Sequence, residues 1–247
     1  CPVCHTRIAP QGANVRVAGE ALEAGSPVLE AGRILDGTSL SAAASVGHGT
    51  LTVLPRPRVI VVSTGTELKR AGEALERGQI PDSNGILLRG LVEEAGGQVV
   101  AHLRTGDTPA ELRHALVLTA GGISAGAYEV VRLTLGTDAG FHHVAQQPGG
   151  PQGVGSTPVG PSGHETPVIC LPGNPVSAYV TFLLFVRPFV LRLQGIQAVE
   201  PQAVTLISGF DWTNPDRRRE FLRAVHLPDG RLGLFRQQGS AVLTSAV

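Results

Sequence analysis

The sequence is poor in aromatic and charged residues. Aromatic side chains make up 4% of its 247 residues and charged ones 16%, with 20 Lys and Arg balanced by 20 Asp and Glu. An average soluble protein is about 25% charged. A neutral chain with few rings lacks the basic surface and the stacking platforms on which nucleic-acid binding depends. We therefore expect no nucleic-acid partner.

Long apolar runs and cysteines are also scarce. The longest apolar stretch, Val176–Val186, is interrupted by Ser177 and Thr181, whereas a bilayer-spanning helix needs about 20 apolar residues. Three cysteines do not predict a disulfide framework, and no charged segment leads into an apolar signal core. We therefore expect no transmembrane helix, no membrane partner and a cytoplasmic location.

Methionine is absent altogether, and the chain starts at Cys1, so we expect the sequence to be incomplete. Residues 1–56 read as a partial N-terminal region. Their turn-rich pattern predicts short strands at Asn14–Val17 and Gly49–Val53 and a short helix at Leu40–Val46. This is too little apolar sequence for an independent core.

Residues 57–195 alternate between strand and helix patterns. Arg58–Ser63 is a nearly continuous β-branched run, typical of a strand buried on both faces. Further strands are predicted at Gln98–Arg104, Leu116–Thr119, Phe141–Ala145 and Pro167–Leu171, and helices from Thr108 and over Gly85–Ala95, Tyr128–Leu135 and Pro175–Leu193. This order predicts an α/β domain with a mostly parallel sheet and helices on both faces.

The last part of the chain, residues 196–247, has a different pattern and is predicted to be a small β domain. Its expected strands are Val204–Phe210, Arg219–Leu227, Arg231–Phe235 and Val242–Thr244. Within the α/β domain, residues 149–163 are rich in glycine, proline and serine, and we expect a flexible loop there.

Glycine-rich and polar loops follow the predicted parallel strands. Ligands of open parallel sheets bind outside the carboxyl ends of the strands, where these loops would meet. Gly121, Gly122 and Gly126 allow the backbone to approach a ligand, and Ser124 adds a hydroxyl, so this loop suits an oxyanion. Gly173-Asn174-Pro175 precedes a helix whose first N–H groups also favour an anion, although a simple helix cap is the better explanation of this segment taken alone.

Four carboxylates lie at or near the same predicted edge: Glu67, Asp82, Asp107 and Glu129. Each by itself is explained as a surface acid or a helix cap. Together with the two anion-binding loops they suit Mg²⁺, which prefers oxygen ligands and neutralises phosphate. The residues alone therefore predict a nucleotide- or phosphate-ester-binding domain with a magnesium ion.

The motifs taken together resemble a known family. They are Ser-Thr-Gly-Thr-Glu67-Leu, Pro81-Asp-Ser-Asn84, Thr-Ala-Gly-Gly-Ile-Ser-Ala-Gly126, His143-Val-Ala145, Leu-Pro-Gly-Asn-Pro-Val-Ser177-Ala, Arg219-Glu-Phe221 and Gln238-Gly-Ser240. In this order and spacing the chain, from about residue 14 to residue 247, is similar to the molybdopterin molybdenumtransferases. This family is called MoeA in bacteria and the E domain of gephyrin in animals.

The resemblance implies a function and an assembly. Family members insert molybdenum from molybdate into adenylylated molybdopterin in a Mg²⁺-dependent step that releases AMP. They are elongated homodimers of four domains, of which residues 57–195 would be the third and residues 196–247 an incomplete fourth, a β-barrel. Contacts with other proteins of molybdenum cofactor biosynthesis are a further expectation.

The resemblance also implies site residues. Glu67, Asp107 and Glu129 would be catalytic and metal-binding, Glu129 standing where many members have aspartate. The expected substrate-binding residues are Ser63, Thr64, Gly65, Asp82, Ser83, Asn84, Gly121, Gly122, Ser124, Gly126, His143, Gln147, Pro172, Gly173, Asn174, Pro175, Ser177, Arg219 and Ser240. The family's lysine-rich segment is represented here by His143, Gln147 and Gly150, so its oxyanion would be neutralised differently or its turnover altered.

Other interpretations remain open. A catalytically altered paralogue could bind pterin or a partner without turnover, and the related adenylyltransferase shares the central fold. Cys1-Pro-Val-Cys4-His5 has haem- or zinc-like spacing, but the chain offers no export signal and no second ligand pair. Cys170 lies in an apolar strand and is expected in the core. A structural role for His143 is as well supported as an oxyanion contact.

Overall fold

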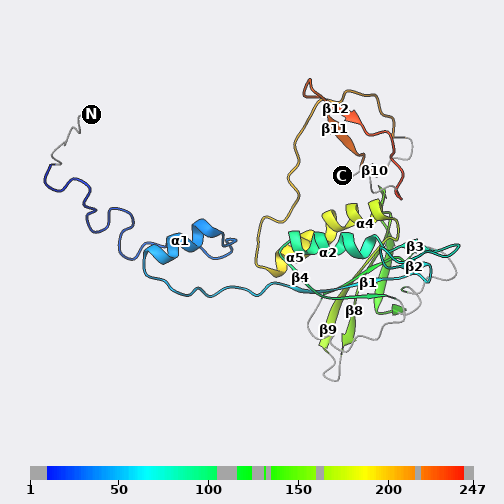
Figure 1. Cartoon of the computed structure of the whole chain (residues 1–247), viewed down its shortest axis with the longest axis horizontal. Coiled ribbons are helices and arrows are strands. Elements are labelled where there is room, and N and C mark those ends of the chain that lie inside the picture. Colours follow the sequence, from blue (N-terminus) through cyan, green and yellow to red (C-terminus); the bar gives the residue numbers. More distant parts are fainter. Residues whose placement is uncertain are drawn as a thin grey trace. The chain divides into compact units, whose positions relative to one another are not determined.

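The computed structural model describes residues 10–104, 116–123, 131, 135–159, 164–214 and 218–241. The chain divides into two compact units, residues 1–53 and 54–247, and each is described by itself (Figure 1). The first unit contains helix α1, Gly37–Ser45. The Asp36 carboxylate caps this helix by accepting a hydrogen bond from the Ser39 N–H at 2.7 Å. The helix therefore begins at Gly37, three residues before the predicted start at Leu40.

The prediction of two short strands in the first unit is wrong. Residues 14–17 and 49–53 form turns and irregular backbone, and Val15, Val17 and Val53 are exposed. A β-branched residue favours a strand only where a neighbouring strand and a buried face are present. The described part of this unit supplies neither.

The second unit is organised around a six-stranded sheet with the order β4-β1-β5-β9-β8-β6. The strands are β1 Arg58–Ser63, β4 Gln98–Arg104, β5 Leu116–Ala120, β6 Ala139–His143, β8 Pro151–Val159 and β9 His164–Leu171. The pairs β1–β4, β1–β5 and β5–β9 are parallel, and β8 and β6 continue the sheet antiparallel. The predicted mostly parallel α/β sheet is confirmed.

One face of this sheet is covered by helix α2, Asn84–Glu94, and by a long helical segment (Figure 1). That segment consists of α4 Pro175–Thr181, the π-helical turn η1 Phe182–Val186 and α5 Arg187–Leu193. Side chains alternate along β1, so Val59 and Val61 pack under these helices with Phe182. Ile60 packs on the opposite face in a second cluster.

The second cluster contains Val117, Val168 and Cys170 from neighbouring strands and Val131 from a helical position. A core on both sides of β1 explains why its sequence is apolar throughout. The predicted helix from Thr108 lies outside the described residues, and of the predicted Tyr128–Leu135 helix only residues 131 and 135 are described.

The segment Pro175–Leu193 is, within the described chain, the one helix whose length and apolar character would suffice to cross a membrane. Phe182, Val186 and Val190 are fully buried against the sheet. Its apolar side is therefore accounted for by the core of this unit.

The flexible loop predicted at residues 149–163 is wrong for most of its length. Residues 151–159 form β8, which pairs antiparallel with β9 from Gly153–Cys170 to Val159–His164. A Cβ at Gly153 would lie 2.8 Å from the Phe141 ring, and one at Gly155 would overlap Asp138. The glycines that made this segment look like a loop permit close packing between strands.

The C-terminal part contains short strands: β10 Arg219–Glu220, β11 Ala224–His226 and β12 Leu232–Leu234. β11 and β12 form an antiparallel hairpin, and β10 pairs with β7, Gln146–Gln147, at the edge of the α/β domain. Residues 204–210 contribute one isolated bridge, between Ser208 and Leu232, in place of the predicted strand. The predicted strand Val242–Thr244 lies outside the described residues, and the β-barrel stays a prediction.

A buried carboxylate fixes the start of helix α2. Asp82 is 4% exposed, and its Oδ1 accepts a hydrogen bond from the Gly85 N–H at 2.9 Å. The other carboxylate oxygen lies 3.2 Å from Nε2 of His102 on β4, and the same nitrogen lies 3.1 Å from the Ser63 Oγ at the end of β1. This cluster ties α2 to two neighbouring strands.

Gly85 is where the helix backbone meets this cluster. A Cβ added there would overlap the His102 imidazole and lie 2.8 Å from the Asp82 Oδ2. Gly85→Ala should therefore lower the free energy of unfolding by about 1–3 kcal/mol, because the ring must move and release Asp82. Urea denaturation measures this change.

Gly90→Ala is the matched control on the same helix. A Cβ at Gly90 meets no atom within 4 Å, and alanine is the better helix former, so this variant should be more stable by about 0.5–1 kcal/mol. Equal effects of the two substitutions would contradict the packing argument.

Asp82 should also contribute a pH-dependent part of the stability. Burial raises its pKa, but hydrogen bonds from His102, Gly85 and Ser63 outweigh burial and hold the pKa below the ordinary 3.8. A lowered pKa stabilises the fold above the unfolded-state value, and this stabilisation is lost as the pH falls through the folded-state pKa.

Asp82→Asn should cost about 1–3 kcal/mol at pH 5. The difference from wild type should shrink as the pH falls below 3.8. Asp229→Asn is the control, because that carboxylate pairs with Arg231 on an exposed turn, where solvent screening leaves the pair with little effect on stability. A pH-independent difference for Asp82→Asn in thermal unfolding would refute this assignment.

Candidate functional site

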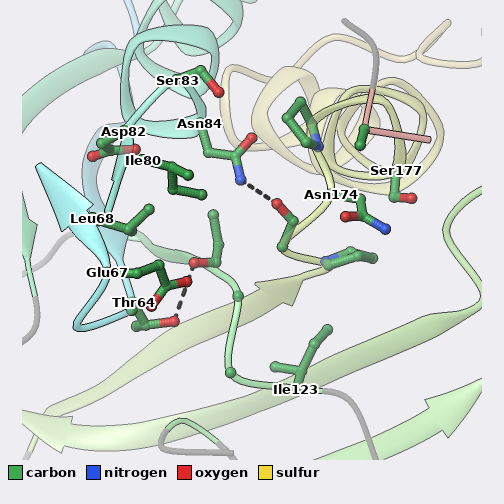
Figure 2. Close-up of a pocket in the computed structure, with 18 of the residues that line it drawn as sticks. Thr64, Glu67, Leu68, Ile80, Asp82, Ser83, Asn84, Ile123, Asn174 and Ser177 are labelled. Carbon is green, nitrogen blue, oxygen red and sulfur yellow. Dashed lines mark hydrogen bonds between the residues drawn. The ribbon is translucent and has the colours of Figure 1, made fainter. Parts of the chain in front are cut away.

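A cleft of about 1010 Å³ lies at the carboxyl ends of β1, β5 and β9 (Figure 2). Its position is the one expected for ligands of an open parallel sheet. Segments that are far apart in the sequence line it: residues 64–68, 80–84, 120–123 and 172–175, with Pro151, Ser177 and Ala241.

The backbones of three loops are tied together at the base of the cleft. The Thr64 N–H and Oγ1 both donate to the Ala120 carbonyl, each at 3.1 Å, and the Gly121 N–H donates to the Leu171 carbonyl at 3.0 Å. Gly121 has a φ of +97°, and a Cβ there would lie 2.8 Å from the Thr64 carbonyl oxygen. A side chain at position 121 would separate these loops.

Glu67 lies in the loop after β1 and is exposed at the cleft, as predicted. Its carboxylate folds over Gly65, where an added Cβ would lie 2.7 Å from both carboxylate oxygens. Two short paired strands, β2 Leu68–Lys69 and β3 Ile80–Pro81, hold this loop, and the Ile80 N–H donates to the Glu67 carbonyl at 3.0 Å. The backbone carrying the carboxylate is therefore fixed on both sides.

Asn84 bridges two walls of the cleft. Its Nδ2 donates to the Gly173 carbonyl at 2.6 Å, which fixes the orientation of the amide (Figure 2). Among the described residues the buried Oδ1 has no hydrogen-bond partner. Because this oxygen is buried and the Nδ2 is engaged, the amide holds the two walls together. Ser83, the neighbouring predicted residue, also lines the cleft.

Asp82 and Ser63 are less accessible than predicted. Asp82 borders the cleft, but its carboxylate is engaged by His102 and Gly85, and Ser63 is 1% exposed and does not line the cleft. The serine, the histidine and the aspartate do not form a catalytic triad, because both partners contact the same nitrogen, Nε2. Their role is structural support of the cleft wall.

His102 was missed by sequence reasoning. A single histidine within a strand pattern belongs to no motif, and its partner Asp82 is 20 residues away on another element. Only the glycine at position 85, inside a predicted helix start, hinted at a close approach.

The start of α4 is already occupied by the chain itself. Pro175 has no N–H, and the Val176 N–H donates to the Ser240 carbonyl at 3.0 Å. The Asn174 Nδ2 donates to the Ser240 Oγ, also at 3.0 Å. Of the first N–H groups of this helix, for which an anion contact is predicted, that of Val176 is therefore taken by Ser240. Pro172, Gly173, Asn174, Pro175 and Ser177 do line the cleft, as expected.

Besides Ser63 and Ser240, three predicted contacts lie outside the cleft lining: His143, Gln147 and Arg219. The Gln147 Oε1 accepts a hydrogen bond from the Arg218 Nη1 at 3.3 Å, and the Arg219 guanidinium stacks over Phe221 at 5.4 Å. The antiparallel β6 and the β7–β10 pair carry these residues away from the ends of the parallel strands, which explains the difference from the predicted convergence.

Several predicted residues lie outside the described part of the chain: Asp107, Ser124, Gly126, Glu129, Cys1, Cys4 and His5. Of the proposed metal ligands, only Glu67 is described. Within the described ranges no three His, Cys, Asp or Glu residues are grouped to hold a metal ion. Cys170 is fully buried, and burial raises its thiol pKa, in agreement with the expected core position.

Known proteins are similar to this chain in sequence and in fold. A family profile described as a probable molybdopterin binding domain matches residues 60–192. A curated relative from Mycobacterium tuberculosis, molybdopterin molybdenumtransferase 2, is 41% identical over 235 residues, covering 88% of this chain and 56% of the relative. A molybdopterin molybdenumtransferase from Staphylococcus aureus is 30% identical, covering 85% of this chain and 52% of the relative.

The solved structure of a molybdopterin biosynthesis MoeA protein from Pyrococcus horikoshii agrees in fold. Its TM-score is 0.69 at 24% identity, and the match covers 92% of this chain and 56% of that protein. The chain spans about half the length of the curated relatives it matches. On the family profile, the chain belongs to the family of probable molybdopterin binding domains, and its relatives of 30% to 41% identity are named molybdopterin molybdenumtransferases.

Proposed function

We propose that the protein inserts molybdenum from molybdate into adenylylated molybdopterin with release of AMP. The observation that carries this proposal is the cleft, whose lining comes from four of the motifs shared with the family: the segments at residues 64–68, 81–84, 120–123 and 172–177. Relatives that are 30% to 41% identical bear the transferase name.

The shape and the lining of the cleft suit a phosphorylated pterin. Its volume, about 1010 Å³, is at the upper end of small-molecule sites. Its walls combine apolar side chains, Leu68, Ile80 and Ile123, with the amides of Asn84 and Asn174. Apolar walls accommodate a flat ring system, and placed amides orient its N–H and carbonyl groups.

Glu67 is the residue we assign to the reacting end of the substrate. It is the described carboxylate that is both exposed and at the cleft, whereas Asp82 is buried and engaged. A carboxylate on a fixed backbone can hold or move a proton at a phosphate or water oxygen. Asp107 and Glu129 remain proposed partners from the family resemblance.

Magnesium fits the part of its proposed site that is described, because Glu67 offers two carboxylate oxygens and Thr64 and Thr66 add hydroxyls at the same edge. When bound, Mg²⁺ would supply neutralisation of phosphate charge. The chain's own contribution is to keep the glutamate over Gly65 at the base of the cleft.

The remaining expectations belong to the same proposal. His143, Gln147 and Gly150 replace the family's lysines, and Arg218, which directly precedes β10, contacts Gln147, so arginine supplies positive charge to this edge. We propose a cytoplasmic homodimer that works beside other molybdenum cofactor biosynthesis proteins, by analogy with the family.

Glu67→Gln should lower the rate of molybdate-dependent AMP release by about 100-fold or more, because the amide cannot accept a proton or carry the charge. The full-length protein is incubated with adenylylated molybdopterin, Mg²⁺ and molybdate, and AMP is followed by chromatography. Glu94→Gln, an exposed residue at the end of α2, is the matched control and should retain the wild-type rate.

Two outcomes would contradict the proposal. Equal rates for wild type and Glu67→Gln would remove Glu67 from the reaction. Tight pterin binding with no AMP release by the wild type would instead identify a pterin-binding paralogue without turnover.

A further inference from the structure

The C-terminal segment contacts the α/β domain at two separate places. At the first, the Arg219 N–H donates to the Ala145 carbonyl at 2.9 Å and the Phe221 N–H donates to the Gln147 carbonyl at 2.8 Å. At the second, the Ser240 carbonyl accepts a hydrogen bond from the Val176 N–H, and the Ser240 Oγ accepts one from the Asn174 Nδ2, at the start of α4. The next residue, Ala241, lines the cleft. Ser240 therefore stands at the edge of the proposed active site.

Arg223 connects these two contacts. It lies two residues after Phe221, and its Nη2 donates to the carbonyls of Gln237 at 2.7 Å and Gly239 at 3.3 Å. The Gln238 side chain completes the junction, since its Oε1 accepts from the Arg223 N–H at 3.0 Å and its Nε2 donates to the Arg223 carbonyl at 2.8 Å. The three residues before Ser240 are thus docked on one arginine.

The Arg223 guanidinium bonds backbone carbonyl groups and is not paired with a carboxylate in the described structure. Burial lowers its pKa, and its buried Nε has no hydrogen-bond partner in the described structure. Arg223 is half-buried, and the cost of desolvating its unpaired Nε is offset by the hydrogen bonds that it makes to residues 237–239.

We propose that Arg223 is a positioning residue that sets the place of Ser240 at the cleft. Its guanidinium spans two carbonyls of residues 237–239 and so fixes the approach of the chain to Asn174 and Val176. The kinetic consequence rests on the proposed transferase function. The structural consequence, a stable Ser240 contact with α4, does not.

Arg223→Gln should lower kcat for AMP release by about tenfold to 100-fold with little change in KM, because a misplaced group at the reacting centre affects turnover more than binding. Arg223→Lys should recover part of the rate, since one ammonium group can bond one of the two carbonyls. Arg231→Gln is the matched control. It removes a guanidinium from the exposed turn beside β12, where Arg231 pairs with Asp229, and should leave kcat unchanged.

Coupling distinguishes positioning from general destabilisation. If Arg223 acts through Ser240, Arg223→Gln should add nothing to the loss caused by Ser240→Ala in the double variant. Multiplication of the two losses would overturn the proposal. Gln238→Ala, which releases the same loop and retains the guanidinium, should resemble Arg223→Gln and serves if that variant folds poorly.

Hydrogen exchange supplies a readout independent of activity. The Val176 amide should be protected in the wild type and should exchange at least about tenfold faster in Arg223→Gln, whereas amides of β5 should be unchanged. Unaltered protection of Val176 would refute the positioning role. Absence of AMP release by the wild type would refute the proposed function alone, because the exchange result still decides the role of Arg223.

Discussion

The cleft depends on the close approach of three backbone segments where β1, β5 and β9 end. Hydrogen bonds from Thr64 to Ala120 and from Gly121 to Leu171 hold these loops in contact. Such bonds form only because position 121 carries no side chain and adopts a positive φ. The centre of the site is attached to this junction: Glu67 lies in the first loop, and the second and third loops form the floor and the wall toward α4.

The walls are fixed from outside by buried polar groups. Asp82 uses one oxygen to hold the start of α2 and the other to contact His102, and Asn84 then reaches across to Gly173. On the opposite side, Arg223 and Gln238 hold the segment that ends at Ser240. Polar groups of this kind are costly to bury unless they are bonded, and here the bonds determine where cleft residues stand.

The sequence predicted the parallel core well and the edges poorly. The β-branched run Arg58–Ser63 coincides with β1, because burial on both faces leaves an unambiguous pattern. Residues 151–159 have the composition of a loop, because their glycines and prolines resemble turn residues although they serve strand packing. Of the described motif residues, those at positions 64–67, 121–122 and 172–175 line the cleft as expected, whereas His143 and Gln147 do not. The contacts of His102, Arg223 and Ser240 could not be predicted, since each joins segments separated by 14 residues or more and leaves no local pattern.

The long sequence separation of the cleft residues determines when the cleft can form during synthesis of the chain. Its lining begins at Thr64 and ends at Ala241, and the Asn174–Ser240 bond joins residues 66 positions apart. The sheet can pair once β9 has left the ribosome, but the contact at α4 requires some 70 residues more. Contacts between distant segments form late because loop closure must precede them. A nascent chain would therefore possess its hydrophobic core before it possesses a complete cleft, and premature capture of a ligand during synthesis is disfavoured.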